Sequence, residues 1–232
     1  MVDNLRVVIA AAGKGSRMES ATNKQYLLLN SRPVLTYSLE FFEQVDLVDE
    51  IVVVASEKEV DYCRNEIVKK YGFKKVSQVL AGGKERQDSV WAGLRSLGSD
   101  TDFVAVHDGA RPLLSLEVLN RLLQEAIEWG AAIPGVVSKD TIKVVDRDGF
   151  VRNTLDRTVV FGIQTPQVFK YKELYAAYQQ AYEEGFTGTD DAYLFENYIG
   201  RVKVVEGDYN NIKITTPGDL ITVGALLSSR RD

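Results

Sequence analysis

Short apolar runs alternate with amphipathic stretches along most of the chain. Runs rich in β-branched residues, such as LRVVIAA at 5–11, EIVVVAS at 50–56 and FVAVHD at 103–108, predict buried strands. The stretches between them, such as PVLTYSLEFFEQ at 33–44, place apolar residues at helical spacing. This alternation predicts an α/β fold, a Rossmann-like and mostly parallel sheet with helices on both faces.

Two of the predicted helices carry clear end signals. In SLEVLNRLLQEAIEWG, Ser115 can cap the first turn and Gly130 ends the helix. In the final stretch, TTPGDLITVGALL, Thr216 is the expected cap, Pro217 takes the first helical position, and Asp219 follows three residues after the cap. The chain therefore predicts a helix after the last strand as well as between strands.

The segment from about 138 to 164 breaks this rhythm. KDTIKVVDRDGFVRNTLDRTVVFGIQ alternates apolar and polar residues at period two around an RDG turn, which predicts a β-hairpin. A hairpin inserted into an α/β fold has little core of its own to pack against. We expect it to project as an arm onto a partner subunit.

Composition narrows the class of protein. Hydrophobic residues make up 45% of the 232 residues, enough for one core, so we expect a single domain over 1–232. The 28 basic residues are outnumbered by 33 acidic ones, which argues against nucleic acid as a partner. The sequence has no long apolar run, so we expect no membrane partner, and the lone Cys63 is expected to be a packing residue of a cytoplasmic protein.

The loop AAAGKGSRM at 10–18 follows the first predicted strand. A dinucleotide fingerprint would need a small residue where Met18 stands, and a Walker A loop would need Ser or Thr after Gly-Lys, so both interpretations fail. What remains is a glycine-rich turn whose backbone N–H groups can face an anion. With Lys24 nearby, this turn suits a triphosphate; the alternative is a tight turn with solvated basic residues.

Further motifs add to this loop: AGGKERQDSVWAGL, VHDGARP, KDTIK, TLDR, QTPQVF, GTDDA and VEGDYNNIKITTPGDL. As an ordered set over residues 5–227, they closely resemble the 2-C-methyl-D-erythritol 4-phosphate cytidylyltransferase family. The resemblance implies a nucleotide-diphospho-sugar-transferase-like fold, with transfer of CMP from CTP to methylerythritol phosphate in the non-mevalonate isoprenoid pathway. It also implies dependence on Mg²⁺ and a homodimer whose exchanged arms help complete the active sites.

Ribitol-5-phosphate cytidylyltransferase, or another alditol- or sugar-phosphate cytidylyltransferase, is the nearest alternative. The ribitol enzyme shares the opening loop, the QTPQ segment and the NIKITT-like ending. The motifs KDTIK, VHDGARP and GTDDA favour the erythritol enzyme. Some members of the family carry Asp at the position of Asn210, and we assign no metal or acid role there.

The reaction brings two anions together, so it requires charge neutralisation and in-line positioning more than a protein nucleophile. A cation about 4 Å from a developing charge contributes on the order of 4 kcal/mol at an effective dielectric constant of about 20. Several cations are therefore needed. The resemblance implies that Arg17 and Lys24 stabilise the pentacoordinate α-phosphate.

For the nucleotide, the resemblance implies contacts from three short segments and one carboxylate. Backbone groups of Ala11, Ala12, Gly13 and Gly15 would line the triphosphate, Gly82, Gly83 and Ser89 would accept the cytosine edge, and Arg86 would buttress that loop. Asp108 ends a predicted strand, a suitable place to contact both substrates and an Mg²⁺ that bridges phosphates. The structural alternatives are a helix-capping turn at 82–89 and a turn-capping Asp108.

For the acceptor, the resemblance implies contacts from Arg111, Thr141, Arg157, Thr165, Thr189 and Lys213. Arg157 lies on the predicted arm and would act in the neighbouring subunit, while Lys213 would position the acceptor phosphate near the α-phosphate. The alternatives are structural: threonines within strands, a solvated Lys213, and a GTDDA helix cap whose acidic residues favour the helix dipole. His107 is expected to be a packing residue.

Overall fold

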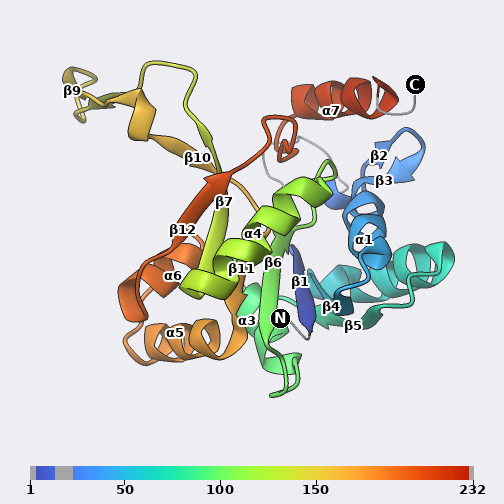
Figure 1. The fold of residues 1–232 in the computed structure, drawn as a ribbon. Coiled ribbons are helices and arrows are strands. Elements are labelled where there is room, and N and C mark those ends of the chain that lie inside the picture. The colour runs from blue at the N-terminus through green and yellow to red at the C-terminus, as the bar shows by residue number, and fades with distance from the viewer. Residues whose placement is uncertain (1–3, 14–22, 230–232) are drawn as a thin grey trace.

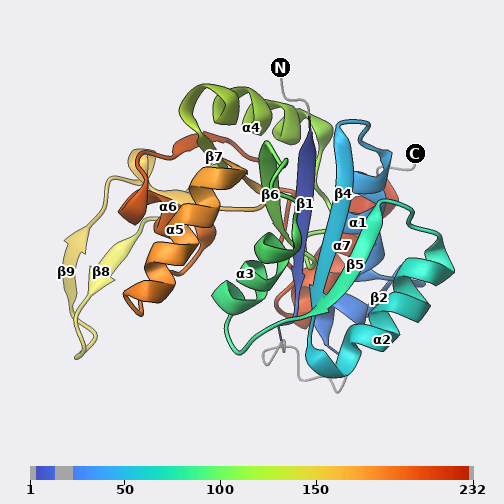
Figure 2. The same cartoon turned by 90° about the horizontal axis from the view of Figure 1, so that it is seen from below.

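The computed structural model describes residues 4–13 and 23–229. Its main sheet has eight strands in the order β10-β7-β11-β6-β1-β4-β5, with β12 beside β7 (Figures 1 and 2). The strands are β1 (Leu5–Ala11), β4 (Val48–Ala55), β5 (Val76–Ala81), β6 (Phe103–Asp108), β7 (Ala131–Val137), β10 (Phe161–Ile163), β11 (Gln167–Lys170) and β12 (Lys203–Glu206). Two small hairpins lie outside this sheet, β2 (Leu28–Leu29) with β3 (Arg32–Pro33) and β8 (Lys143–Val145) with β9 (Val151–Thr154).

Most neighbouring strands of the main sheet run parallel, as predicted. β1 is parallel to β4 and β6, β4 to β5, and β12 to β7. The two exceptions are β10 and β11, which are antiparallel to their neighbours. The chain enters both strands without a preceding crossover helix, and antiparallel pairing needs none. The α/β class and the mostly parallel sheet are confirmed, and β10 and β11 make the sheet a mixed one.

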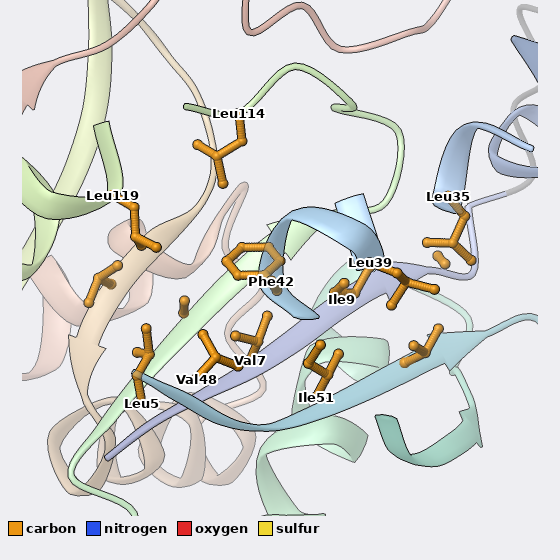
Figure 3. Packing of buried hydrophobic residues seen from close by; sticks show 14 of the residues in the cluster. Leu5, Val7, Ile9, Leu35, Leu39, Phe42, Val48, Ile51, Leu114 and Leu119 are labelled. Carbon is orange, nitrogen blue, oxygen red and sulfur yellow. The ribbon is translucent and has the colours of Figure 1, made fainter. Parts of the chain in front are cut away.

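The helices cover both faces of the sheet. They are α1 (Val34–Gln44), α2 (Val60–Tyr62) continued by a π-helical segment (Cys63–Lys69), α3 (Arg86–Ser96), α4 (Leu116–Trp129), α5 (Tyr171–Glu183), α6 (Asp191–Tyr198) and α7 (Pro217–Ser229). Leu5, Val7 and Ile9 point to the face covered by α1 and α4, as Figure 3 shows. Val8 points to the opposite face, which α3, α5 and α6 cover. Strand β1 is therefore apolar on both of its faces.

The predicted helix ends are confirmed. Ser115 Oγ accepts a hydrogen bond from the backbone N–H of Val118, and Gly130 ends α4 with φ +86°. At α7, Thr216 and Asp219 form reciprocal side-chain to backbone hydrogen bonds. The expectation for the lone cysteine also holds, because Cys63 is fully buried in the core.

The predicted arm contains a hairpin that extends away from the rest of the molecule (Figures 1 and 2). β8 and β9 are exposed along their whole length, and the turn between them uses Gly149 at φ +87°. The hairpin is shorter than predicted, because Phe161–Ile163 forms β10 and joins the main sheet beside β7. Period-two alternation is common to hairpins and edge strands, so the pattern does not separate them.

A third apolar cluster lies beneath α7. Val223 packs with Leu29, Tyr37, Leu113 and Ile214. Ile214 is further tied to the loop after β6 by a backbone hydrogen bond from its N–H to the carbonyl of Ala110, 2.9 Å long. This cluster fixes the chain on both sides of residue 213. Among the described helices, none combines the length and the apolar character that crossing a membrane requires.

Candidate active site

The carboxyl ends of β1, β5 and β6 lie at one edge of the sheet, and the predicted loops follow them. Ala11 ends β1, Ala81 ends β5 and Asp108 ends β6. The connection between β12 and α7, which carries Lys213, reaches the same edge through the Ile214 hydrogen bond. In an open α/β sheet, this edge is where ligands bind.

Asp108 forms the centre of a group of cations. Lys213 Nζ lies 2.6 Å from Asp108 Oδ2, and Arg86 Nε lies 3.3 Å from Oδ1. Arg111 Nε is 3.8 Å from Oδ2. Burial alone would raise the pKa of Asp108, but the charges of Arg86 and Lys213 outweigh it and hold that pKa far below its usual range. The carboxylate is therefore ionised, and four predicted site residues meet here.

Arg86 binds a second buried carboxylate. Its Nη1 and Nη2 donate to the two carboxylate oxygens of Asp191 at 3.0 and 2.8 Å, and Tyr178 OH donates to Asp191 Oδ1 at 2.6 Å. Asp191 is fully buried and binds this pair. It is also the first residue of α6, where an acidic side chain favours the helix dipole, as the structural alternative predicted. Asp190 is the cap of α6 and accepts from the N–H of Tyr193. No local pattern indicates the Arg86–Asp191 pair, since its members stand 105 positions apart.

Thr165 binds the backbone of Asp108, and His107 in turn contacts Thr165. Thr165 Oγ1 accepts from the backbone N–H of Asp108 at 3.0 Å and lies 3.2 Å from His107 Nδ1. His107 Nε2 lies 3.1 Å from the carbonyl oxygen of Arg111, an acceptor, which assigns the ring proton to Nε2. Burial lowers the pKa of His107 to about 4, so the ring is neutral. The expected packing role of His107 agrees with these contacts.

Arg111 is held by Asn211 as well as by Asp108. Its Nη1 donates to the carbonyl of Asn211 at 2.7 Å, and the Asn211 amide donates to the carbonyl of Thr165 at 2.9 Å. Asn211 is fully buried. Its supporting role was missed at the sequence level; the run of two asparagines before Ile212 was the available signal.

The predicted cytosine loop packs against the loop after β1. A Cβ atom on Gly82 would lie 2.6 Å from Ser89 Oγ and 2.7 Å from Ala12 Cβ, so glycine is required there. A Cβ on Gly83 would lie 2.2 Å from the Cβ of Asp88. The structure therefore brings Ala12, Gly82, Gly83 and Ser89 together. As the structural alternative predicted, the turn also caps a helix, since Glu85 and Asp88 form a reciprocal cap on α3.

Of the opening loop, Ala11, Ala12 and Gly13 are described, whereas Gly15 and Arg17 lie outside the described residues. Lys24 begins a short 3-10 turn, Lys24–Tyr26. The next residue, Gln25, is buried and donates from its amide to the carbonyl of Ala11. This bond attaches the segment that carries Lys24 to the end of β1.

Three predicted acceptor contacts remain, and all three are exposed residues. Thr141 and Arg157 are exposed residues of the arm, and Arg157 Nη1 donates to the carbonyl of Lys139 at 3.2 Å. Thr189 is exposed in the loop before α6. The residues that contact Asp108 thus come from the body of the chain, while two predicted acceptor contacts come from the arm.

The predicted magnesium ligand is Asp108. Over residues 4–13 and 23–229, no three His, Cys, Asp or Glu side chains gather in a way that could hold a metal ion. Both oxygens of Asp108 already face cationic groups, which would repel a dication. The described residues therefore do not fit a metal held by protein ligands alone, and the assignment of Mg²⁺ to Asp108 stays a prediction.

Comparison with known proteins agrees with this geometry. Residues 5–229 match the family model described as IspD, 2-C-methyl-D-erythritol 4-phosphate cytidylyltransferase. The protein of that name from Caldanaerobacter subterraneus is 45% identical over 224 residues, covering 97% of this chain and 99% of its own length. The one from Lachnoclostridium phytofermentans is 46% identical over 234 residues, covering 100% and 99%.

Solved structures give the same result. The 4-diphosphocytidyl-2C-methyl-D-erythritol synthase of Anaerococcus prevotii superposes with a TM-score of 0.85 at 35% identity, covering 97% of this chain and 96% of that one. The 2-C-methyl-D-erythritol 4-phosphate cytidylyltransferase of Thermus thermophilus gives 0.79 at 31% identity, covering 96% and 98%. This chain belongs to the 2-C-methyl-D-erythritol 4-phosphate cytidylyltransferase family.

Proposed function

We propose that the chain transfers CMP from CTP to 2-C-methyl-D-erythritol 4-phosphate, giving 4-diphosphocytidyl-2-C-methyl-D-erythritol and pyrophosphate. Membership of the family supports the reaction. The observation that carries it is the group of Arg86, Arg111 and Lys213 around Asp108, next to two glycine-containing loops at the carboxyl edge of the sheet.

In this reaction, an oxygen of the acceptor phosphate forms a bond to the α-phosphorus of CTP, and the bond from that phosphorus to pyrophosphate breaks. The attacking phosphate is already anionic, so the chain needs no general base. Arg86, Arg111 and Lys213 face Asp108 and Asp191, which leaves one net positive charge. That net positive charge attracts an incoming phosphate and stabilises the negative charge that builds up during attack.

Lys213 is the residue we assign to the acceptor phosphate. Its side chain is 36% exposed, whereas that of Asp108 is 9% exposed, so the ammonium lies between the buried carboxylate and solvent. Asp108 orients the ammonium group through this ion pair. Arg111, locked by Asn211, would supply a second cation from the same side.

The nucleotide would occupy the neighbouring loops. Gly82, Gly83 and Ser89 leave space for a pyrimidine, and a purine would collide with the loop. The backbone around Gly13 would line the triphosphate, with Lys24 and Arg17 at the α-phosphate. The support for this arrangement is the close approach of Gly82 to Ala12 and Ser89.

Mg²⁺ would enter with CTP, because the triphosphate oxygens supply ligands that the described residues lack. Bound there, it would neutralise part of the triphosphate charge. Asp108 would stay paired with its three cations.

We also propose that the working form is a homodimer joined through the arm. An isolated two-stranded hairpin is marginally stable in water. The arm carries exposed apolar side chains at Val145, Phe150, Val151 and Val159, between 54% and 73% exposed. A second subunit would cover them, and Arg157 would then reach the partner's acceptor site.

The direct test is pyrophosphate release from CTP with methylerythritol phosphate and ribitol 5-phosphate as parallel acceptors. We expect turnover with the first, little with the second, and a product whose mass equals that of the acceptor plus a cytidylyl group. Turnover of ribitol phosphate alone would replace the proposed acceptor by the alternative one. ATP and GTP serve as nucleotide controls and should give little pyrophosphate.

A further inference from the structure

Two buried glutamines flank the loop that carries Thr189. This loop, residues 186–190, joins α5 to α6, and we call it the acceptor loop. Gln87 comes from the first turn of α3 and is 7% exposed; Gln167 comes from the start of β11 and is 1% exposed. Neither belongs to the group around Asp108.

Gln87 holds the first half of the acceptor loop through both ends of its amide. Its Nε2 donates to the carbonyl of Phe186 at 3.0 Å, and its Oε1 accepts from the N–H of Gly188 at 2.8 Å. A Cβ on Gly188 would lie 2.8 Å from Leu194 Cδ2, so the backbone is also pressed against α6 at this point.

Gln167 holds the second half in the same way. Its Nε2 donates to Asp190 Oδ2 at 2.8 Å, and its Oε1 accepts from the N–H of Ala192 at 3.0 Å. Gly188 and Asp190 are the immediate neighbours of Thr189, so the chain is fixed on each side of it. Thr189 itself is exposed.

The first turn of α3 makes further contacts with the same region. On either side of Gln87, Arg86 binds Asp191, and Asp88 accepts a hydrogen bond from Tyr182 OH at 2.6 Å. Three consecutive residues of the helix that follows the cytosine loop thus bind α5, the acceptor loop or α6. The cytosine loop with α3 is therefore joined by side-chain hydrogen bonds to α5, the acceptor loop and α6.

We propose that Gln87 and Gln167 are positioning residues that fix Thr189 relative to the cytosine loop, and thereby hold the acceptor substrate in place. The inference rests on the proposed function, because Thr189 is taken as an acceptor contact. An amide suits this task since it donates and accepts at once. Methionine has a similar length but cannot donate, and its sulfur is only a weak acceptor.

The test compares Gln87→Met, Gln167→Met and Thr189→Val in steady-state kinetics. Removing these buried hydrogen bonds is expected to raise KM for methylerythritol phosphate by about tenfold in each glutamine variant, and KM for CTP by less than about twofold. Gln180→Met is the matched control, because Gln180 is an exposed glutamine of α5 bonded to Glu184. A similar rise in both KM values would overturn the proposal.

A double variant separates positioning from general destabilisation. In a Thr189→Val background, Gln87→Met should raise the acceptor KM no further, because its effect passes through Thr189. Additive effects would contradict this. If Gln87→Met does not fold, as judged by its thermal transition, Gln167→Met carries the same comparison.

Hydrogen exchange supplies a readout that does not depend on activity. The amide of Gly188 should exchange faster in Gln87→Met than in Gln180→Met, and unchanged protection would overturn the proposal. Wild-type turnover with methylerythritol phosphate is measured first. Failure of the proposed function then shows in the wild type, while failure of the positioning role of Gln87 and Gln167 shows only in the variants.

Discussion

Lys213 Nζ lies 2.6 Å from Asp108 Oδ2, although Asp108 ends β6, before the arm in sequence, and Lys213 lies in the connection between β12 and α7, after it. Asp108 is buried, whereas Lys213 reaches solvent. The carboxylate therefore sets where the ammonium group stands, and the ammonium group is the one that can meet a phosphate.

Replacing Asp108 by Asn should damage both stability and catalysis. Three cations would be left without their shared carboxylate, and we expect the free energy of unfolding to fall by about 3 kcal/mol. Turnover should fall by about two orders of magnitude. Urea unfolding and pyrophosphate release measure the two effects. Asp100→Asn is the control, since Asp100 pairs with Arg6 at the surface and should cost less than about 1 kcal/mol.

His107 predicts a pH dependence of stability. Burial lowers its pKa to about 4, below the ordinary histidine value of 6.5, so the unfolded chain takes up a proton first as the pH falls. This contribution is complete above pH 6.5 and is lost on acidification toward pH 4. Between pH 7 and 5 it amounts to about 2 kcal/mol.

The check is urea unfolding of the wild type and His107→Gln at both pH values. The variant should lose less stability on acidification by about that amount. Equal losses in the two proteins would mean that His107 titrates alike in the folded and unfolded chains.

Lys24→Ala should lower turnover by about two to three orders of magnitude and leave the fold intact, because the proposed role of Lys24 is to supply one cation to the transition state. Circular dichroism and pyrophosphate release check the two halves of this prediction. Lys58→Ala, a change at an exposed lysine, serves as the control. Near-normal release by Lys24→Ala would remove Lys24 from the catalytic group.

The arm predicts complementation between subunits. Arg157→Ala and Lys24→Ala should each be nearly inactive as homodimers. In a mixed dimer, one of the two sites combines an intact Lys24 with an intact Arg157 from the other chain, so activity should return to about half that of the wild type. Heterodimers confirmed by mass and still inactive would argue that each site is completed within one chain.

The fold followed from local patterns wherever a strand was long and apolar. The runs at β1, β4 and β6 were predicted, as were the caps of α4 and α7, because burial and capping depend on neighbouring residues. The place of β10 in the main sheet was not predicted, since its three residues were assigned to the hairpin, and β11 was not predicted as a strand, since it is only four residues long.

In the candidate site, the residues in sequence motifs were predicted and the residues that support them were not. Asp108, Arg86, Arg111 and Lys213 were named from motifs, and the structure brings them together. Their supports were missed: Asp191 pairs with a residue 105 positions away, and Gln87 contacts a carbonyl 99 positions away. Buried polar pairs of this kind depend on which helices meet, and no local pattern records that.

The most direct test of the proposed reaction follows the phosphorus atoms of CTP. With CTP radiolabelled at the α-phosphate, the label should appear in the methylerythritol product, and with CTP labelled at the γ-phosphate it should appear in pyrophosphate alone. Transfer of the γ-label to the acceptor would contradict attack at the α-phosphorus, and release of the α-label as free CMP without acceptor product would contradict transfer to methylerythritol phosphate.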